Sequence, residues 1–289
     1  MDITIRMARA DDQGPIEAFT TDTFEWGDYV HESWLRWLAT PNLNLLVAVD
    51  NDDTPVATSA ARMLSATEGW LQGTRVRPDW RRIGVAQALA EHQRTWVRDA
   101  GGQVLRLCVE AENGPARAQV ESDGYRPDCT WIEGSGPVVS ARPVPTTNGG
   151  SRTKVNAPLS RAAAADAVPA LMSWSSGDLY RAARAMFAVD WTWRRLTEGD
   201  LVAAAQQDAL WTGPTGWAVA AANGSDLEVA WMETRPEDAN DFVRGLLAIA
   251  SDEHAAHIKI VAPDLPWVRS AFEKPGLDIA DLVVYGKPL

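Results

Sequence analysis

The sequence predicts an α/β protein, of the α+β kind, in which one arrangement of strands and helices occurs twice. Alternating apolar residues in segments such as 3–6 and 103–109 have the period of β-strands. Apolar residues three and four apart, as in 31–39, have the period of helices. Arg77-Pro78-Asp79 has a counterpart at Arg235-Pro236-Glu237. We therefore interpret the chain as two related halves.

The length of the chain and one biased segment predict where these halves divide. A chain of 289 residues with 46% hydrophobic residues can bury about two domains of ordinary size. Residues 136–157 are rich in Pro, Gly, Ser and Thr and have little apolar pattern, which is typical of a linker. We therefore expect one domain at residues 1–135 and a second at residues 158–289.

Charge and cysteine content restrict the classes of function. The net charge of -12 disfavours binding to nucleic acid or anionic membranes and would attract a cationic amine. Cys108 and Cys129 give no disulfide framework, the N-terminus lacks the apolar run of a signal peptide, and no segment is long enough to span a membrane. We expect a cytoplasmic protein without a metal. Its 14 tryptophans fill cores or, alternatively, form walls around an apolar or flat substrate.

The elements of the first half follow from these periods and from turn residues. Arg9 to Asp12 should cap a helix that contains Ile16, Phe19 and Phe24, and Gly101-Gly102 should stop the helix that begins at Val85. In chain order we expect a strand at 3–6, helices at 13–24 and 31–39, a hairpin of 43–49 with 56–64, a strand at 70–76, a helix from 85, a strand at 103–109, a helix at 116–122 and a closing strand at 124–131.

One segment, Arg81 to Ala86, has the features of an anion site. It joins the end of a strand to the start of a helix, where free backbone N–H groups and the helix dipole favour a phosphate. Gly84 allows close approach of the backbone, Ala86 adds little bulk, and Arg81 and Arg82 bring positive charge to the rim. The alternative is an ordinary basic turn before an amphipathic helix.

The string Arg81-Arg82-Ile83-Gly84-Val85-Ala86 resembles the pyrophosphate loop of the GNAT superfamily of acyl-CoA-dependent N-acyltransferases. Its pattern is Gln or Arg, two residues, Gly, one residue, then Gly or Ala, and the order of elements from Ile3 to about Glu133 is also that of the GNAT fold. The resemblance implies a mixed, mostly antiparallel sheet flanked by helices in each half. It also implies acetyl-CoA or another acyl-CoA as co-substrate.

The second half resembles a GNAT copy that has lost this loop. At the matching place it has Ala239 to Arg244, without glycine, and Asp238 and Asp241 would repel a pyrophosphate. The arrangement resembles tandem GNAT proteins. It implies transfer of an acyl group to an amine, in our reading one on a small molecule, by a protein that could form a homodimer. The alternatives are a catalytically silent acyl-CoA-binding or interaction module and a protein N-acetyltransferase.

The resemblance also implies further cofactor contacts. The backbone from Thr74 to Val76 would face the acyl carbonyl, and Val85 belongs to the loop that holds the pyrophosphate. Asn113 matches a position whose side chain contacts the cofactor, and its alternative role is that of a helix cap.

The usual proton-transfer residues of the family are not at their usual positions. The position of a common tyrosine, which protonates the thiolate, is Val120, and that of a common glutamate is Trp70. Glu68, two residues before Trp70, and Glu110, at the end of a strand, are the candidate bases in their place. The alternative for both is a solvated surface carboxylate.

Overall fold

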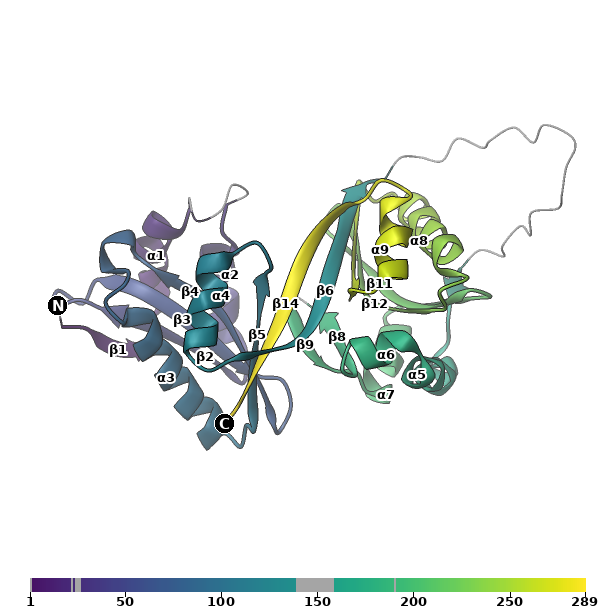
Figure 1. Ribbon diagram of the computed structural model, residues 1–289. Helices are drawn as coiled ribbons and strands as arrows, with labels where there is room; N and C mark the ends of the chain where they lie inside the picture. The colour runs from purple at the N-terminus through teal and green to yellow at the C-terminus, as the bar shows by residue number, and fades with distance from the viewer. Residues whose placement is uncertain (1, 22, 24–26, 139–158, 190) are drawn as a thin grey trace, which may run out of the picture. The chain divides into compact units, whose positions relative to one another are not determined.

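A computed structural model describes residues 2–21, 23, 27–138, 159–189 and 191–289 of the chain (Figure 1). The described residues form two compact units, each of which draws on separate segments of the sequence. Unit 1 contains Met1–Cys108, Ala118–Arg126 and Tyr285–Leu289, and unit 2 contains Val109–Arg117 and Pro127–Val284. Phe24 and residues 139–157 of the predicted linker lie outside the described residues.

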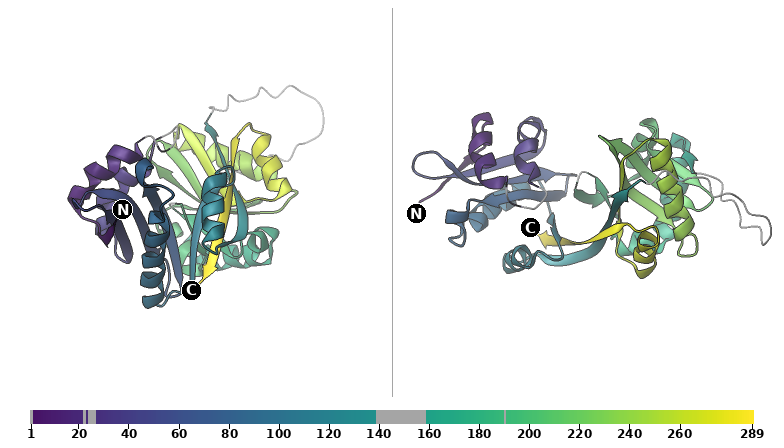
Figure 2. Two further views of the ribbon diagram at one scale, coloured as in Figure 1. Left: turned by 60° about the vertical axis from the view of Figure 1, so that its left-hand side comes forward. Right: turned by 90° about the horizontal axis from the view of Figure 1, so that it is seen from above.

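Unit 1 has a sheet with helices on both faces (Figures 1 and 2). Strands β1 to β4 pair antiparallel in chain order, and β5 pairs parallel to β4. Its elements are β1 (Thr4–Met7), η1 (Ala10–Asp12), α1 (Gln13–Thr20), α2 (Tyr29–Ala39), β2 (Leu43–Val49), β3 (Pro55–Met63), β4 (Glu68–Val76), η2 (Pro78–Trp80), α3 (Val85–Asp99), the first residues of β5 (Val104–Glu110) and the last residues of α4 (Gly114–Ser122).

The alternation of apolar residues in β2 explains this layering. Leu45 and Val47 pack with Trp34 of α2, whereas Leu46 and Ala48 lie in a second cluster with residues of α3. Because successive side chains of a strand point to opposite faces, a strand that is apolar throughout is covered on both sides. The β2–β4 hairpins therefore form a rigid layer that holds the start of α3.

Unit 2 also combines a mixed sheet with helices. Its elements are β6 (Arg126–Pro137), β7 (Ser160–Arg161), η3 (Ala164–Asp166), α5 (Ala167–Ser176), α6 (Asp178–Ala182), β8 (Met186–Val189), β9 (Thr192–Arg195), α7 (Glu198–Gln206), β10 (Leu210–Gly213), β11 (Gly216–Asn223), β12 (Asp226–Thr234), α8 (Ala239–Asp252), β13 (His257–Pro263), α9 (Pro266–Glu273) and most of β14 (Asp278–Pro288). Strands β8 and β9 form a separate hairpin.

The two units repeat one order of elements, which agrees with the predicted internal repeat. The antiparallel pair β11–β12, helix α8, the parallel strand β13 and helix α9 match β3–β4, α3, β5 and α4. Each small helix is followed by a glycine in the left-handed region, Gly124 at φ 87° and Gly276 at φ 84°. The predicted α/β class, with mixed sheets flanked by helices, is confirmed.

The predicted closing strand of the first half lies mostly in unit 2. Strand β6 pairs antiparallel with β13 in unit 2, for example Trp131 with Pro263. Unit 1 instead contains Tyr285–Leu289 at the end of β14, where the Leu289 N–H donates to the Gln103 carbonyl at 3.0 Å. The compact units thus depart from the proposed boundaries at residues 109–117, 127–135 and 285–289, and Gly136 and Pro137 of the predicted linker end β6.

A chain that ends at Val284 should lose stability in unit 1. Tyr285 has no exposed surface and its hydroxyl donates to Glu121 at 2.8 Å, so its loss removes about as much stability as a large aromatic truncation, roughly 3–5 kcal/mol. A fragment of residues 1–135 should aggregate for the same reason. Attaching residues 278–289 to it through a flexible linker should restore solubility. A soluble, cooperatively unfolding fragment without this addition would contradict the assignment.

Candidate functional site

Two left-handed residues form the turn before α3. Arg82 has φ 64°, and Gly84, the N-cap of the helix, has φ 90° and makes no side-chain cap. Val85, which is 3% exposed, packs the first turn of the helix against the sheet. This conformation favours glycine at 84 and directs the chain from the end of β4 into the helix.

The start of α3 offers backbone donors to an anion. The first N–H groups of a helix lack intrahelical partners, and no side chain caps this helix. A Cβ atom built on Gly84 has no heavy atom within 4 Å, so the space before the helix is open. Arg81 donates from Nε to the Val76 carbonyl at 3.0 Å, and Arg82 is exposed beside it. The residues present therefore fit a diphosphate group.

Strands β4 and β5 separate beside this loop. Their pairing runs from Glu68–Val104 to Trp70–Arg106, whereas β4 continues to Val76. Strand β4 also carries a β-bulge, in which Gly73 and Thr74 lie opposite Ser59 of β3, with the Ser59 and Thr74 hydroxyls 3.0 Å apart. Separated strands expose the edge of β4 at Thr74 and Val76, where an acyl carbonyl could accept a hydrogen bond.

A group of polar residues at the bulge was missed by the sequence analysis. The Asp28 carboxylate is buried and caps α2, because its Oδ1 accepts a hydrogen bond from the Val30 N–H at 3.0 Å. Its Oδ2 pairs with Arg75 Nε at 2.5 Å. Tyr29 as a whole residue is 37% exposed. Its hydroxyl is buried, and this burial raises the pKa of Tyr29, with Arg75 and the Gly73 N–H opposing the shift. Tyr29 therefore stays protonated near neutral pH. The signal was Asp28 as a helix N-cap before an apolar helix.

Glu68 lies in a buried ion pair, not on the solvated surface. The residue is 8% exposed and its Oε1 accepts from Arg106 Nη1 at 2.7 Å, while Ser65 Oγ donates to Oε2 at 3.2 Å. It starts β4, and Val76 at the loop ends it, about 26 Å away at the rise of a strand. The geometry favours a structural role for Glu68.

Glu110 is the last residue of β5, and Asn113 lies three residues further along the chain. Both belong to the segment Val109–Arg117 of unit 2. Glu110 is exposed. The Asn113 Oδ1 accepts from the Ala116 N–H at 3.1 Å, so this side chain caps α4 as the alternative interpretation expected. A contact between Asn113 and the cofactor stays a prediction.

Gly73 is expected to tolerate no side chain. It has φ 62°, and a Cβ atom would lie 2.6 Å from Trp37 Cη2. Gly73→Ala should therefore lower the free energy of unfolding by roughly 2–5 kcal/mol through backbone strain and overpacking. Gly224→Ala is the matched control, because Gly224 has φ 59° and no heavy atom within 4 Å of a Cβ. Equal losses for both variants in urea unfolding would show that contact with Trp37 is unimportant.

Comparison with known proteins identifies the unit that contains this loop. The sequence profile of the acetyltransferase (GNAT) family matches residues 14–125, which include the turn before α3 and the bulge of β4. Residues 14–125 are a GNAT acetyltransferase domain. The chain therefore contains a domain of an acyltransferase family, and its fold supports acetyl transfer from acetyl-CoA. None of the curated proteins compared with the chain matches it.

Solved GNAT structures share the fold of the whole chain. A GCN5-related N-acetyltransferase from Sphaerobacter thermophilus is 12% identical, with a TM-score of 0.67, over 99% of this chain and 95% of its own. A GCN5-related N-acetyltransferase from Kribbella flavida is 18% identical, with a TM-score of 0.54, over 99% of this chain and 72% of its own. At these identities the likeness concerns the fold alone.

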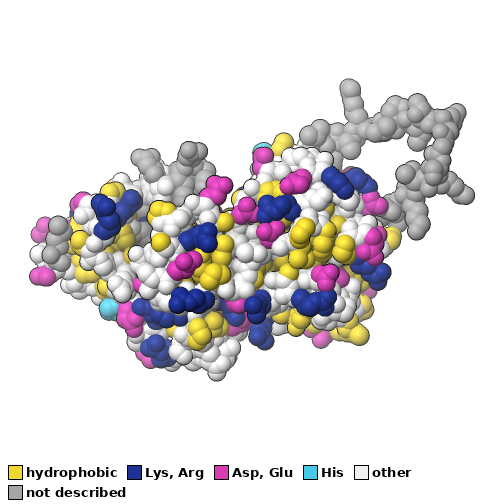
Figure 3. All heavy atoms as spheres, in the orientation of Figure 1, with side chains coloured by type: hydrophobic (Ala, Val, Ile, Leu, Met, Phe, Trp, Pro, Cys, Tyr) yellow, Lys and Arg dark blue, Asp and Glu magenta, His cyan; other side chains and the backbone are white. Residues whose placement is uncertain are grey.

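Two further observations concern the part of the chain that the structure describes. No helix in it is long and apolar enough to cross a bilayer. No group of three or more His, Cys, Asp or Glu side chains in the same ranges is arranged to hold a metal ion. The basic and acidic side chains are interspersed on the face seen in Figure 3.

Proposed function

We propose that the protein transfers an acyl group from an acyl-CoA to the amine of a small molecule. The observation that carries the proposal is the uncapped, glycine-led N-terminus of α3 beside the separated ends of β4 and β5. In this proposal the backbone of Gly84, Val85 and Ala86 binds the pyrophosphate of the donor, and Arg81 and Arg82 neutralise its charge.

The reaction forms one bond and breaks another. The amine nitrogen attacks the thioester carbon, a backbone N–H at Thr74 or Val76 stabilises the oxyanion, and the C–S bond breaks to release the CoA thiolate. Before this attack the alkylammonium gives one proton to Glu110, directly or through water, and we choose Glu110 because it is exposed whereas Glu68 is ion-paired. The tetrahedral intermediate then loses a second nitrogen proton to the departing thiolate or to solvent. A thiol with a pKa of roughly 8.5 leaves as an anion without a strong acid, so Val120 does not prevent turnover.

A silent acyl-CoA-binding module is the second candidate, because the usual acid position is Val120 and Glu68 is held by Arg106. An N-acetyltransferase of proteins is the third. The fold supports all three, since the acceptor is not determined by it. A cytoplasmic location and a homodimer remain predictions from the sequence.

A free-thiol assay with acetyl-CoA and a panel of small amines tests the proposal. We expect amine-dependent release of CoA thiol and a matching N-acetylated product by mass spectrometry. CoA binding without turnover on any amine would favour the silent module. Acetylation of peptides but not of small amines would favour the protein N-acetyltransferase.

A further inference from the structure

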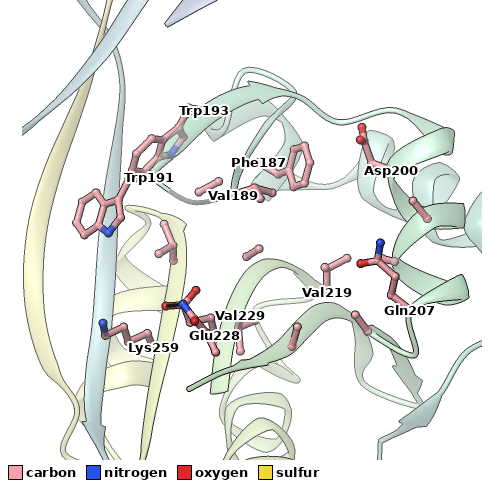
Figure 4. A pocket seen from close by; sticks show the side chains of 18 of the residues that line it. Phe187, Val189, Trp191, Trp193, Asp200, Gln207, Val219, Glu228, Val229 and Lys259 are labelled. Carbon is pink, nitrogen blue, oxygen red and sulfur yellow. Dashed lines mark hydrogen bonds between the residues drawn. The ribbon is translucent and has the colours of Figure 1, made fainter. Parts of the chain in front are cut away.

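Unit 2 encloses a cavity of about 440 Å³ on the face of its sheet (Figure 4). This volume lies in the range of small-molecule sites. The walls come from the β8–β9 hairpin, α7, β11, β12, β13 and β6, all of unit 2. None of the lining residues belongs to the loop at Arg81 to Ala86. The proposed acyl transfer therefore does not account for the cavity.

Aromatic side chains of the hairpin form one wall of the cavity. Trp191, in the turn between β8 and β9, meets Trp193 edge to face with ring centroids 6.0 Å apart. Trp193 is 1% exposed and Trp191 is 53% exposed, so the indole of Trp191 lies where the cavity meets solvent. Phe187 lies on the same hairpin. Trp191 therefore offers flat apolar surface to a ligand, and the buried rings of Trp193 and Phe187 support it from behind.

The sheet contributes carboxylates in excess over cations. Glu228 of β12 pairs in register with Lys259 of β13, and Val261, two residues further, pairs with Glu133 of β6. The three charged side chains line the cavity. Lys259 also lies 3.8 Å from Asp226, so its charge is shared with a further carboxylate. The floor therefore has net negative charge when both Glu133 and Glu228 are ionised.

The other charged pair of the cavity is already neutralised. The two Nη atoms of Arg194 donate to the carboxylate oxygens of Asp200, at 2.9 and 2.6 Å. The Arg194 Cζ lies 4.7 Å from the centroid of the Phe187 ring. Glu228 accepts from Asn223 Nδ2 at 3.0 Å, which leaves its second oxygen for another donor. Charge complementarity thus favours a positively charged ligand over a neutral or anionic one.

Glu133 adds an independent argument. Burial raises the pKa of Glu133, Lys259 opposes the shift, and Glu228 and Glu110 add to it. When Glu133 is ionised, its buried charge lowers the free energy of unfolding, whereas a neutral amide at the same position would not. Such a group is typical of a site where a ligand supplies the missing charge.

We propose that this cavity binds a small organic ammonium ion with an aromatic or aliphatic body. The ammonium would lie between Glu133 and Glu228, and its apolar body would contact Trp191, Val189 and Val219. Binding needs neither an acyl-CoA nor the loop before α3, so the site is separate from the proposed transfer reaction.

The test is calorimetric titration of the full chain with 2-phenylethylamine, 2-phenylethanol and 3-phenylpropionate in the absence of CoA. We expect one amine site per chain in the cavity, with an affinity at least tenfold above that of the alcohol and no binding of the carboxylate. Equal binding of amine and alcohol, or no binding of the amine, would overturn the proposal.

Variants of the lining residues test whether the amine binds in this cavity. Glu228→Gln should weaken binding at least tenfold, and Ala230→Leu should abolish it by filling the cavity. Glu237→Gln, an exposed carboxylate outside the lining, is the control. Gly84→Glu should bind the amine normally, which separates this site from the CoA loop. Amine binding that Glu228→Gln and Ala230→Leu leave unchanged would show that the site lies elsewhere.

Glu133→Gln distinguishes a binding role from a structural one. Because the folded pKa of Glu133 is raised, its carboxylate contributes most favourably when protonated, and that contribution is lost as pH rises. The variant should therefore raise Tm at pH 7.5, with a gain that disappears near pH 4, and weaken amine binding at pH 7.5. A lower Tm at pH 7.5 with unchanged amine affinity would indicate a structural carboxylate and would contradict the proposed site.

Discussion

Replacing Gly84 with glutamate is expected to abolish CoA binding while the chain stays folded. The new side chain would extend into the open space before α3, where Gly84 has φ 90° and a Cβ meets no heavy atom. Its carboxylate would interact favourably with the helix N-terminus and occupy the place of the phosphates. We expect CoA affinity to fall by at least about 100-fold, which corresponds to about 2.8 kcal/mol.

A second glycine supplies the matched control for strain. Gly276 has φ 84° and no heavy atom within 4 Å of a Cβ, so Gly276→Glu introduces the same backbone strain and charge in unit 2. It should bind CoA normally. Asn240→Glu, in the first turn of α8, should likewise leave CoA binding unchanged, because that helix lacks the glycine-led turn. Normal binding by Gly84→Glu in equilibrium dialysis would remove the loop from the site.

The Glu110→Gln variant is expected to lose activity in a pH-dependent manner. A general base accelerates proton removal from an alkylammonium by about 10²–10⁴-fold. We therefore expect kcat/KM to fall by that order at pH 7 and by less at pH 9, where more of the amine is already neutral. Initial rates of CoA thiol release with a single amine across this pH range measure the effect.

Variants of two other carboxylates serve as controls for this experiment. Glu112→Gln, also exposed and two residues further along the chain, should keep full activity at both pH values. Glu68→Gln breaks the ion pair with Arg106 and should lower stability, with a change in rate that does not depend on pH. If Glu110→Gln matches wild type at pH 7, Glu110 is not the base.

Local patterns predicted the parts of the fold that depend on neighbouring residues. The hairpin of β2 and β3, the strand before the loop, the glycine-led start of α3 and the internal repeat all follow from residues close in sequence. The exchange of final strands does not, because β14 reaches unit 1 from the other end of the chain and apolar periodicity carries no information on the partner strand.

Site residues divide in the same way. Gly84 and the arginines lie in one turn, so sequence alone placed them together. Glu68 and Arg106 are 38 residues apart in sequence, and their pairing depends on the register between β4 and β5. Tyr29 reaches the bulge through the packing of α2. The cavity of unit 2 is lined by residues of seven elements, so local patterns could not predict it, although the abundance of tryptophan had suggested aromatic walls.

Titration of the full chain with CoA tests the central claim most directly. The account predicts one site per chain. Among the described residues, only the turn before α3 combines a helix N-terminus without a side-chain cap with a glycine-led loop and two arginines, whereas α8 begins after Asp238. A stoichiometry of two would show that the second copy also binds the cofactor. The absence of any heat of binding, at concentrations that saturate other acyl-CoA enzymes, would contradict the assignment of the loop.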